Sequence, residues 1–238
     1  RGIFVPSRGN LFLASDYSQI ELRLMAHISG DPTMIEAFLH RQDIHRRTAS
    51  EMFGVPQEEV DSELRDKAKA VNFGIIYGIS DFGLAKNTGV TRDEARRFID
   101  TYFERYPMVK EYMDNTVEQA RRTGEVTTIL GRRRPTPDIH SRIRGSRGAA
   151  ERAAINTPIQ GSAADVIKLA MVRIYRRILS EGLESKMILQ VHDELIFDIL
   201  PSEEGAMRKI VLEEMEGVME LKVPLKVETD VGASWYDV

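Results

Sequence analysis

Short runs rich in apolar residues, typical of buried strands, occur near both ends of the chain. Each is five residues long, and several contain the β-branched or aromatic side chains that strands favour. The predicted strands are residues 11–15, 187–191, 195–199 and 225–229. The second and third are separated by only a few residues, so we expect them to form a hairpin.

The long middle part of the chain has the apolar spacing of helices. The predicted helices are residues 20–29, 33–120 with interruptions, 149–181 and 203–218. Pro158 is expected to kink or break its helix, because proline lacks the backbone N–H. Residues 126–138 predict a strand followed by a loop rich in arginine and proline. The whole pattern is α+β, with strands at both ends and a long helical insertion between them.

A polar triplet interrupts the apolar sequence MILQVHDELIFDI at the tip of the predicted hairpin. His192, Asp193 and Glu194 stand between two runs that are both predicted to be buried. Taken alone, the triplet is adequately explained as a polar turn, because Asp favours turns and Glu is easily solvated. Asp16, however, follows the apolar run 11–15 in the same way. If the two strands are neighbours, both carboxylates lie in one cleft, where they repel unless protons or cations intervene.

The composition excludes several classes of protein. Apolar residues make up 42% of the chain and charged residues 29%, and no apolar run approaches the ~20 residues that span a bilayer. The chain has no cysteine, which excludes disulfides, thiol catalysis and cysteine-based zinc sites. It opens with Arg1 rather than with an initiator methionine or a signal peptide, so we expect it to be part of a longer protein.

The charge is unevenly distributed around a net value of −4. Residues 121–152 contain nine arginines and three acidic residues, whereas residues 193–238 contain twelve acidic and four basic residues. The basic segment is compatible with an arginine-rich solvated face, and equally with the docking site of a polyanion.

A stripe of cations and aromatics lies in the segment RDKAKAVNFGIIYG. Arg65, Lys69, Phe73 and Tyr77 recur every four residues, so a helix places them on one face. An exposed basic turn followed by an aromatic core stripe would give the same pattern. Together with Asp16 and a second carboxylate nearby, a nucleotide cradle is the better interpretation, because Arg and Lys bind phosphates.

Five segments, in order, resemble the motifs of family A DNA polymerases. They are DYSQIELR, DIH, RDKAKAVNFGIIYG, ERAAINTPIQGSAAD and VHDEL. The resemblance extends over essentially the whole chain, and five motifs in the same order are much more specific than any one. It implies a right-hand polymerase fold, with a palm sheet and a large helical fingers insertion. The implied domains are palm 1–34, fingers 35–148 and palm 149–238.

The resemblance also implies the chemistry of the site. Asp16 and Asp193 would hold two Mg²⁺ ions, with the Tyr17 carbonyl as a further ligand and Glu194 beside them. Lys69 would protonate the leaving group of the phosphoryl transfer. The residues implied to bind the deoxynucleoside triphosphate are Gln19, Glu21, His45, Arg65, Lys69, Phe73 and Tyr77.

Glu21 would reject ribonucleotides, since in the family this position lies beneath the ribose C2′ and collides with a 2′-hydroxyl. Phe73, in place of a tyrosine, resembles the members that reject dideoxynucleotides. The residues implied to contact primer–template DNA are Arg152, Asn156, Gln160 and His192. Minor-groove acceptors occur in every Watson–Crick pair, so donors there can check pair shape without reading sequence.

A template-directed DNA polymerase is therefore the expected function, acting as a monomer in the cytoplasm with no membrane partner. A thumb is absent from this chain, which leads us to expect weak binding of primer–template. Two alternatives remain open: a single-subunit RNA polymerase, which shares the aspartates, and an inactive DNA-binding fragment. The glutamate at position 21 and the NFGIIYG ending argue against the RNA polymerase.

Overall fold

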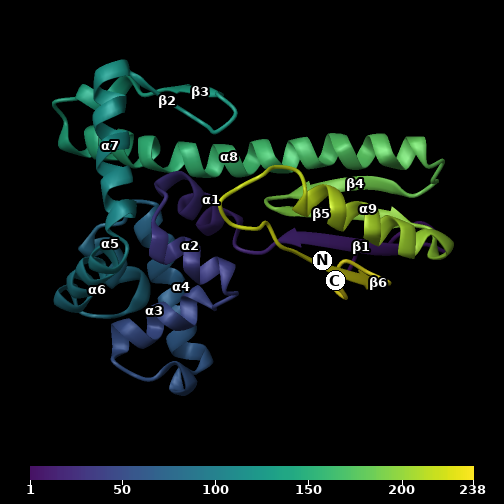
Figure 1. The fold of residues 1–238 in the computed structure, drawn as a ribbon, viewed down its shortest axis with the longest axis horizontal. Coiled ribbons are helices and arrows are strands. Elements are labelled where there is room, and N and C mark those ends of the chain that lie inside the picture. The colour runs from purple at the N-terminus through teal and green to yellow at the C-terminus, as the bar shows by residue number, and fades with distance from the viewer. The chain divides into compact units, whose positions relative to one another are not determined.

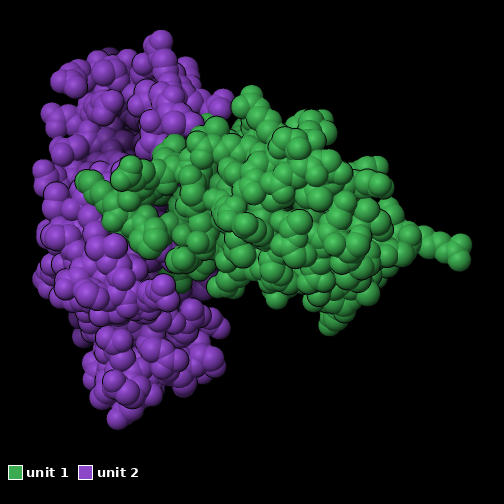
Figure 2. Space-filling view, turned by 45° about the vertical axis from the view of Figure 1, so that its right-hand side comes forward, with its two compact units in different colours: residues 1–20, 163–238 green, residues 21–162 purple.

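The computed structural model describes all residues 1–238, and its elements form an α+β fold (Figure 1). The chain divides into two compact units, coloured separately in Figure 2. Unit 1 consists of residues 1–20 and 163–238, and unit 2 of residues 21–162. Unit 1 is therefore built from both ends of the chain, whereas unit 2 is one continuous segment.

Unit 1 contains a four-stranded antiparallel sheet in the order β4-β5-β1-β6. Its strands are β1 (Leu11–Tyr17), β4 (Lys186–Val191), β5 (Glu194–Ile199) and β6 (Val227–Gly232). Strand β1 pairs with β5 on one side and with β6 on the other. Leu13 and Phe197 face each other across the β1–β5 pair and are fully buried. The predicted sheet and hairpin are thus confirmed.

Helix α9 (Glu204–Glu216) packs against β1 and β6 of this sheet. Tyr17, which is 1% exposed, donates a hydrogen bond of 2.7 Å from its hydroxyl to the Met215 carbonyl of α9. Burial raises the pKa of this tyrosine. Tyr17, the residue after Asp16, therefore fixes the end of β1 to α9.

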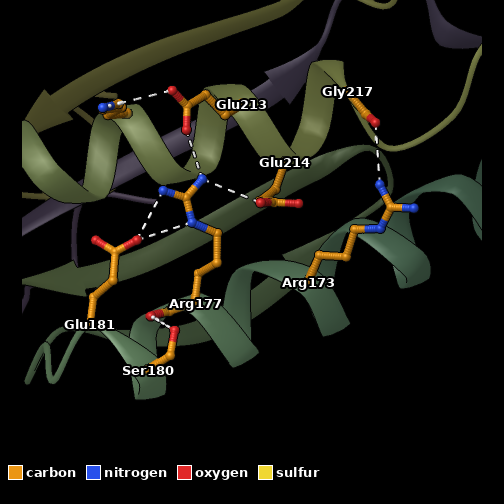
Figure 3. Close-up of polar contacts among 8 residues, drawn as sticks. Arg173, Arg177, Ser180, Glu181, Glu213, Glu214 and Gly217 are labelled. Carbon is orange, nitrogen blue, oxygen red and sulfur yellow. Dashed lines mark hydrogen bonds and ion pairs between the residues drawn. The ribbon is translucent and has the colours of Figure 1, made fainter.

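Arginines of helix α8 (Arg144–Ser180) connect it to α9 within unit 1 (Figure 3). The Arg177 guanidinium lies 2.7 Å from Glu213 and 3.3 Å from Glu214 on α9, and 2.9 Å from Glu181 beyond its own helix. Arg173 donates a hydrogen bond of 3.2 Å to the Gly217 carbonyl, just past the end of α9. A network of this kind fixes geometry better than a single exposed ion pair does.

The strands of unit 1 differ from the predictions in three places. Strand β1 continues through Tyr17, so Asp16 lies within the strand and not after it. Strand β4 was predicted to be buried, but Ile188 and Leu189 are 48% and 40% exposed because β4 lies at the edge of the sheet. The last strand, predicted at 225–229, is β6 at Val227–Gly232.

Unit 2 is mostly helical, as predicted for residues 33–120. Its helices before α8 are α1 (Ile20–Ser29), α2 (Pro32–Leu39), α3 (Ile44–Phe53), α4 (Ser62–Ile76), α5 (Asp81–Thr88), α6 (Arg92–Arg105) and α7 (Pro107–Thr123). The buried Asp31 caps α2 by accepting from the Met34 N–H, and it also accepts from the Met108 N–H at the start of α7. One carboxylate therefore orders the starts of two helices.

Helices α3 and α4 pack closely along an interface that is mostly apolar. Ala49, Val60 and Ala68 form its buried centre. Asp43 caps α3 by accepting from the His45 and Arg46 N–H groups, and Asp61 caps α4 by accepting from Leu64. The caps fix the first turns of both helices, which carry residues of the predicted nucleotide cradle.

Residues 126–138 form a short hairpin, β2 (Glu125–Thr127) paired with β3 (Arg133–Pro135). The prediction of one strand followed by a loop is therefore only half right. Helix α8 begins at Arg144 and runs through Pro158, so the helix is not broken there, while the predicted kink stays a prediction. Hydroxyls of Thr157 and Ser162 donate to the Ala153 and Pro158 carbonyls, but the carbonyl that loses its helical N–H partner at Pro158 is that of Ala154.

The two units divide the chain at residues 20 and 162, whereas the predicted palm and fingers divide it at 34 and 148. The observed units and the predicted domains follow one another in the same order: in both, a continuous, mostly helical segment separates two parts of a unit that contains the sheet. The palm and fingers boundaries stay a prediction.

A close approach between α8 and the residue after β2 yields a test of the packing in unit 2. A Cβ on Gly161 would lie 2.6 Å from Thr128 Cγ2, whereas a Cβ on Gly145 of the same helix would meet nothing within 4 Å. We expect Gly161→Ala to lower the free energy of unfolding by about 1–3 kcal/mol, since overpacked sites strain their neighbours. Gly145→Ala should leave it unchanged or raise it by up to about 1 kcal/mol. Urea unfolding of both variants measures this, and equal effects would contradict the packing described.

Candidate functional site

Three carboxylates lie in a row across the sheet of unit 1. Asp16 on β1 is directly opposite Glu194 on β5 and directly opposite Glu228 on β6. Residues directly opposite in an antiparallel pair have their side chains on the same face. Asp193 occupies the β4–β5 turn, where its carbonyl accepts a hydrogen bond of 3.3 Å from the Tyr17 N–H. The strand pairing thus gathers four acidic groups that are far apart in the sequence.

Partial burial and the close carboxylates together raise the pKa of Asp16 from 3.8 to about 6. Partial burial is the largest cause, followed by the negative charges of Asp193, Glu194 and Glu228, and a hydrogen bond with Asp193 also contributes. This cluster therefore concentrates negative charge on one face of the sheet and would gain from a cation. No group of three or more His, Cys, Asp or Glu side chains in residues 1–238 is arranged to hold a metal ion by itself.

Glu194 is held by groups from both ends of the chain. Its carboxylate, in a residue only 9% exposed, lies 3.0 Å from the Arg1 guanidinium and accepts a hydrogen bond of 3.4 Å from Trp235 Nε1. The guanidinium also stacks on the Trp235 ring, 4.8 Å from its centroid. These contacts balance the charge of Glu194 and fix its side chain beside Asp16.

His192 has an unfavourable backbone conformation in the two-residue turn between β4 and β5. Its φ is 54°, in the left-handed region that side chains other than glycine seldom adopt. A two-residue hairpin turn takes a positive φ at its first central residue, so the turn between β4 and β5 accounts for this conformation. Gln19 has the same feature, with a φ of 55°, between β1 and α1.

In unit 2, α4 carries Arg65, Lys69, Phe73 and Tyr77 on one face, as predicted. Lys69 is exposed, and the other three are half-buried. Arg65 Nε donates to Asp43 at 2.7 Å, which leaves the remaining guanidinium N–H groups for an anion. Burial alone would raise the pKa of Asp43, but hydrogen bonds from Arg65 and the Arg46 N–H hold it below its usual value.

Aromatic rings follow the cations along this stripe. The Phe73 ring centroid lies 6.2 Å from that of Tyr77 and 5.8 Å from that of His45 on α3. The Tyr77 hydroxyl donates a hydrogen bond to the Glu21 carboxylate on α1. The structure therefore brings together Glu21, His45 and the four residues of the stripe within one unit.

His45 is almost fully buried, at 1% exposure, and its Nδ1 lies 2.9 Å from the amide nitrogen of Asn72. Its pKa is lowered from 6.5 to about 4 by burial first, then by the charge of Arg65, with a smaller effect from Lys69. The imidazole is therefore neutral at pH 7, and it can act toward an anion only as a hydrogen-bond donor.

On α8, Arg152, Asn156 and Gln160 fall at intervals of four residues along an uninterrupted helix, so they share one face. Arg152 and Gln160 are exposed, and Asn156 is half-buried with no hydrogen bond to its Oδ1. Part of the basic charge of segment 121–152 is used internally, in pairs such as Arg121–Glu151 and Arg133–Glu125. Arg152 still gives the helix face that it shares with Asn156 and Gln160 a positive charge.

Several residues of the site were missed by sequence reasoning. Glu228 and Trp235 depend on strand register and on a loop at the end of the chain, which no local pattern reveals. Asn72 lies one residue from Phe73 in a motif already recognised, yet its buried position follows only from the packing of α3 on α4.

Comparison with known proteins supports a family assignment. The sequence profile of DNA polymerase family A matches residues 1–237. The chain is 53% identical over 237 residues to DNA polymerase I of Caldicellulosiruptor bescii and 52% identical over 238 residues to that of Bacillus subtilis. Each match covers 100% of this chain but only 28% and 27% of the relative, so the chain spans about a quarter of their length.

A solved structure has the same fold. The POL domain of Pol1 from M. smegmatis, in complex with DNA primer-template and dNTP, is 45% identical with a TM-score of 0.95. The match covers 99% of this chain and 42% of that one. These relatives are named as DNA polymerases.

The raised pKa of Asp16 predicts how its removal alters stability with pH. A folded-state pKa of about 6, against 3.8 unfolded, means that ionising Asp16 opposes folding, fully so above pH 6. Asp16→Asn should therefore stabilise the metal-free chain at pH 8, by about 1 kcal/mol after solvent screening of this exposed carboxyl.

The gain should disappear below about pH 4, where the carboxyl is protonated in both states. Urea unfolding in EDTA at pH 4 and pH 8 measures the difference. Asp230→Asn, at an exposed position of the neighbouring strand β6, is the matched control and should show little change. Destabilisation by Asp16→Asn at pH 8 would contradict the described repulsion.

Proposed function

Because this chain belongs to DNA polymerase family A, we propose that it forms the catalytic portion of a template-directed DNA polymerase. It would add deoxynucleotides to the 3′-hydroxyl of a primer. The observation that carries the proposal is the pairing of Asp16 and Asp193 within hydrogen-bond reach in a cluster of like charges. Such a cluster suits a site that binds cations and phosphates together.

The donor set fits Mg²⁺, which prefers oxygen ligands and typically takes one or two carboxylates, with substrate phosphates and water completing the shell. Asp16 and Asp193 would hold two such ions, and the Tyr17 carbonyl would be a further oxygen ligand. When bound, the ions lower the pKa of the primer hydroxyl and neutralise the triphosphate. Glu194, held by Arg1 and Trp235, would keep its place next to this pair.

The cationic end of α4 would bind the triphosphate of the incoming nucleotide. Arg65, fixed through Nε by Asp43, offers its outer N–H groups, and the exposed Lys69 offers an ammonium group. Lys69 would also donate a proton to the leaving pyrophosphate. The neutral ring of His45 would donate one hydrogen bond to a phosphate oxygen.

The aromatic end of α4 would hold the sugar and base. Phe73 and Tyr77 offer half-buried faces for packing, and the hydrogen bond from Tyr77 fixes Glu21 beside them. Glu21 would then occupy the space that a ribose 2′-hydroxyl needs. Gln19 would complete the lining of the pocket.

Primer–template DNA would contact α8 and the β4–β5 turn. Arg152, Asn156 and Gln160 share one helix face and could donate to minor-groove acceptors, which occur in every base pair. His192 would lie near the primer terminus. We expect the complete protein to act as a monomer in the cytoplasm.

The central test is removal of either aspartate. Residues 1–238, grafted in place of the matched segment of the M. smegmatis POL domain, give a chain of full length for primer extension. Asp16→Ala and Asp193→Ala should each lower the extension rate by roughly three orders of magnitude or more, with little change in duplex affinity. Retention of a tenth of the parent rate would end the assignment.

A second readout of the same variants requires no activity. Trp235 is the only tryptophan of the chain, and it bonds to Glu194 beside the aspartates. Mg²⁺ should therefore change the tryptophan fluorescence of the 238-residue chain, and the Asp16→Ala plus Asp193→Ala double variant should lose this response. An identical fluorescence response in parent and variant would show that Asp16 and Asp193 do not bind the ions.

Sugar selection yields a separate prediction for unit 2. Glu21→Ala removes a steric block and no catalytic group, so it should lower the dNTP/NTP ratio of kcat/KM by at least about tenfold. Tyr77→Phe, which removes only the hydroxyl that fixes Glu21, is the matched partial variant and should give a smaller change in the same direction. An unchanged ratio in Glu21→Ala would place the selection elsewhere.

A further inference from the structure

A chain of three buried polar side chains crosses the α3–α4 interface behind the cationic stripe. His45 and Thr48 lie on α3, Asn72 lies on α4, and all three are between 0% and 4% exposed. His45 Nδ1 is 2.9 Å from Asn72 Nδ2, and Thr48 Oγ1 is 3.1 Å from Asn72 Oδ1. Asn72 therefore links the two helices with both ends of its amide.

This arrangement has a cost that packing alone does not explain. The rest of the interface is built from small and branched apolar side chains such as Ala49, Ala68 and Val60. A buried amide that lacks partners costs about 1–3 kcal/mol, so a polar group in such a place is retained only where it is bonded. An apolar residue would fill position 72 more simply, which indicates that the amide has a purpose toward its partners.

The arrangement of donors and acceptors determines where the proton of the imidazole lies. An amide nitrogen only donates, so the ring nitrogen that faces it must be an unprotonated acceptor. In a neutral ring the single N–H is then at Nε2. The Thr48 hydroxyl lies 3.1 Å from the amide oxygen and 2.8 Å from the Ile44 carbonyl, so these two acceptors share its single proton. Rotating the amide by half a turn would reverse the outcome and put the proton on Nδ1.

The surrounding charges keep the ring neutral. Burial disfavours the charged form of the ring, and the positive charges of Arg65 and Lys69 disfavour it as well. Asp43, at the N-cap of α3, and Asp66 on α4 oppose this effect without reversing it. With Nδ1 occupied by Asn72, Nε2 is the ring nitrogen left for a ligand, and because the ring is 1% exposed, neighbouring side chains must move to admit one. A phosphate oxygen has lone pairs and no proton, so only a ring protonated at Nε2 can bind it.

We propose that Asn72 is a positioning residue that fixes His45 as the Nε2–H tautomer, so that the ring donates to the triphosphate of the incoming nucleotide. Asn72 touches no substrate in this arrangement and acts only through His45. The triphosphate part of the inference depends on the proposed function, whereas the tautomer is a property of the free chain. The two can therefore fail separately.

The tautomer can be measured without substrate. The chain has five histidines in 27.0 kDa, so ring ¹⁵N labelling resolves them, and His45→Gln identifies the signals of His45. At pH 7 the parent should show an unprotonated Nδ1 and a protonated Nε2. Asn72→Asp, which can only accept, should move the proton to Nδ1 or charge the ring. A parent His45 protonated at Nδ1 would overturn the proposal with no variant needed.

The effect on the nucleotide is tested in the grafted full-length chain. Asn72→Leu should raise the KM for dNTP by roughly tenfold. In a His45→Gln background the same change should have almost no further effect, because Asn72 acts through the ring. Val71→Ala, which truncates a neighbouring side chain that is 1% exposed, is the control for loss of helix packing and should leave the ¹⁵N pattern unchanged.

Two further outcomes separate the tautomer from the proposed function. If the ring has the expected tautomer but His45→Gln leaves KM unchanged, the triphosphate role fails and the positioning by Asn72 stands. If Asn72→Leu raises KM equally with and without His45, Asn72 acts by another route and the proposal is wrong.

Discussion

The pairing of β1 with two partners from the far end of the chain is the constraint on which the structure depends. It joins residues 11–17 to residues 194–199 on one side and to residues 227–232 on the other. Without this pairing Asp16 has no carboxylate neighbours and Tyr17 has no contact with α9. In the sequence the whole of unit 2 lies between β1 and β4, so the register of the sheet decides which acidic groups meet.

The same register places like charges directly opposite each other, which is unfavourable in a sheet. The surrounding structure compensates for this repulsion. Arg1 forms an ion pair with Glu194, and Trp235 donates a hydrogen bond to it. The buried strand β5 pairs with one side of β1, and α9 accepts a hydrogen bond from Tyr17. In unit 2, Asp43 ties down Arg65, and Asn72 occupies one nitrogen of His45. Both units thus hold charged groups in fixed positions by means of neighbours that need not touch a substrate. Local rules are broken where binding chemistry requires it.

Much of this organisation could be predicted from the sequence, because apolar runs and helical spacing are local properties. The sheet strands, the hairpin and the helices of residues 33–120 follow from them. The exposure of β4 does not, since an edge strand can have the same apolar composition as a central one. Pro158 lies inside helix α8, and no rule about proline alone anticipates this. Glu228 and Asn72 required register and helix packing, which are set by the whole fold.

The position of β1 also affects the order in which the chain can fold during synthesis. Unit 2 is continuous in sequence, so it can become compact as soon as residue 162 is available. The sheet cannot close until residue 232 has been made, because β6 is the partner of β1 on one side. At about 5–20 residues per second, β1 waits roughly 10–40 s for that partner. Both edges of this apolar strand stay unpaired until β5 ends at residue 199, and the edge that meets β6 stays unpaired until residue 232, which makes the strand prone to association during synthesis.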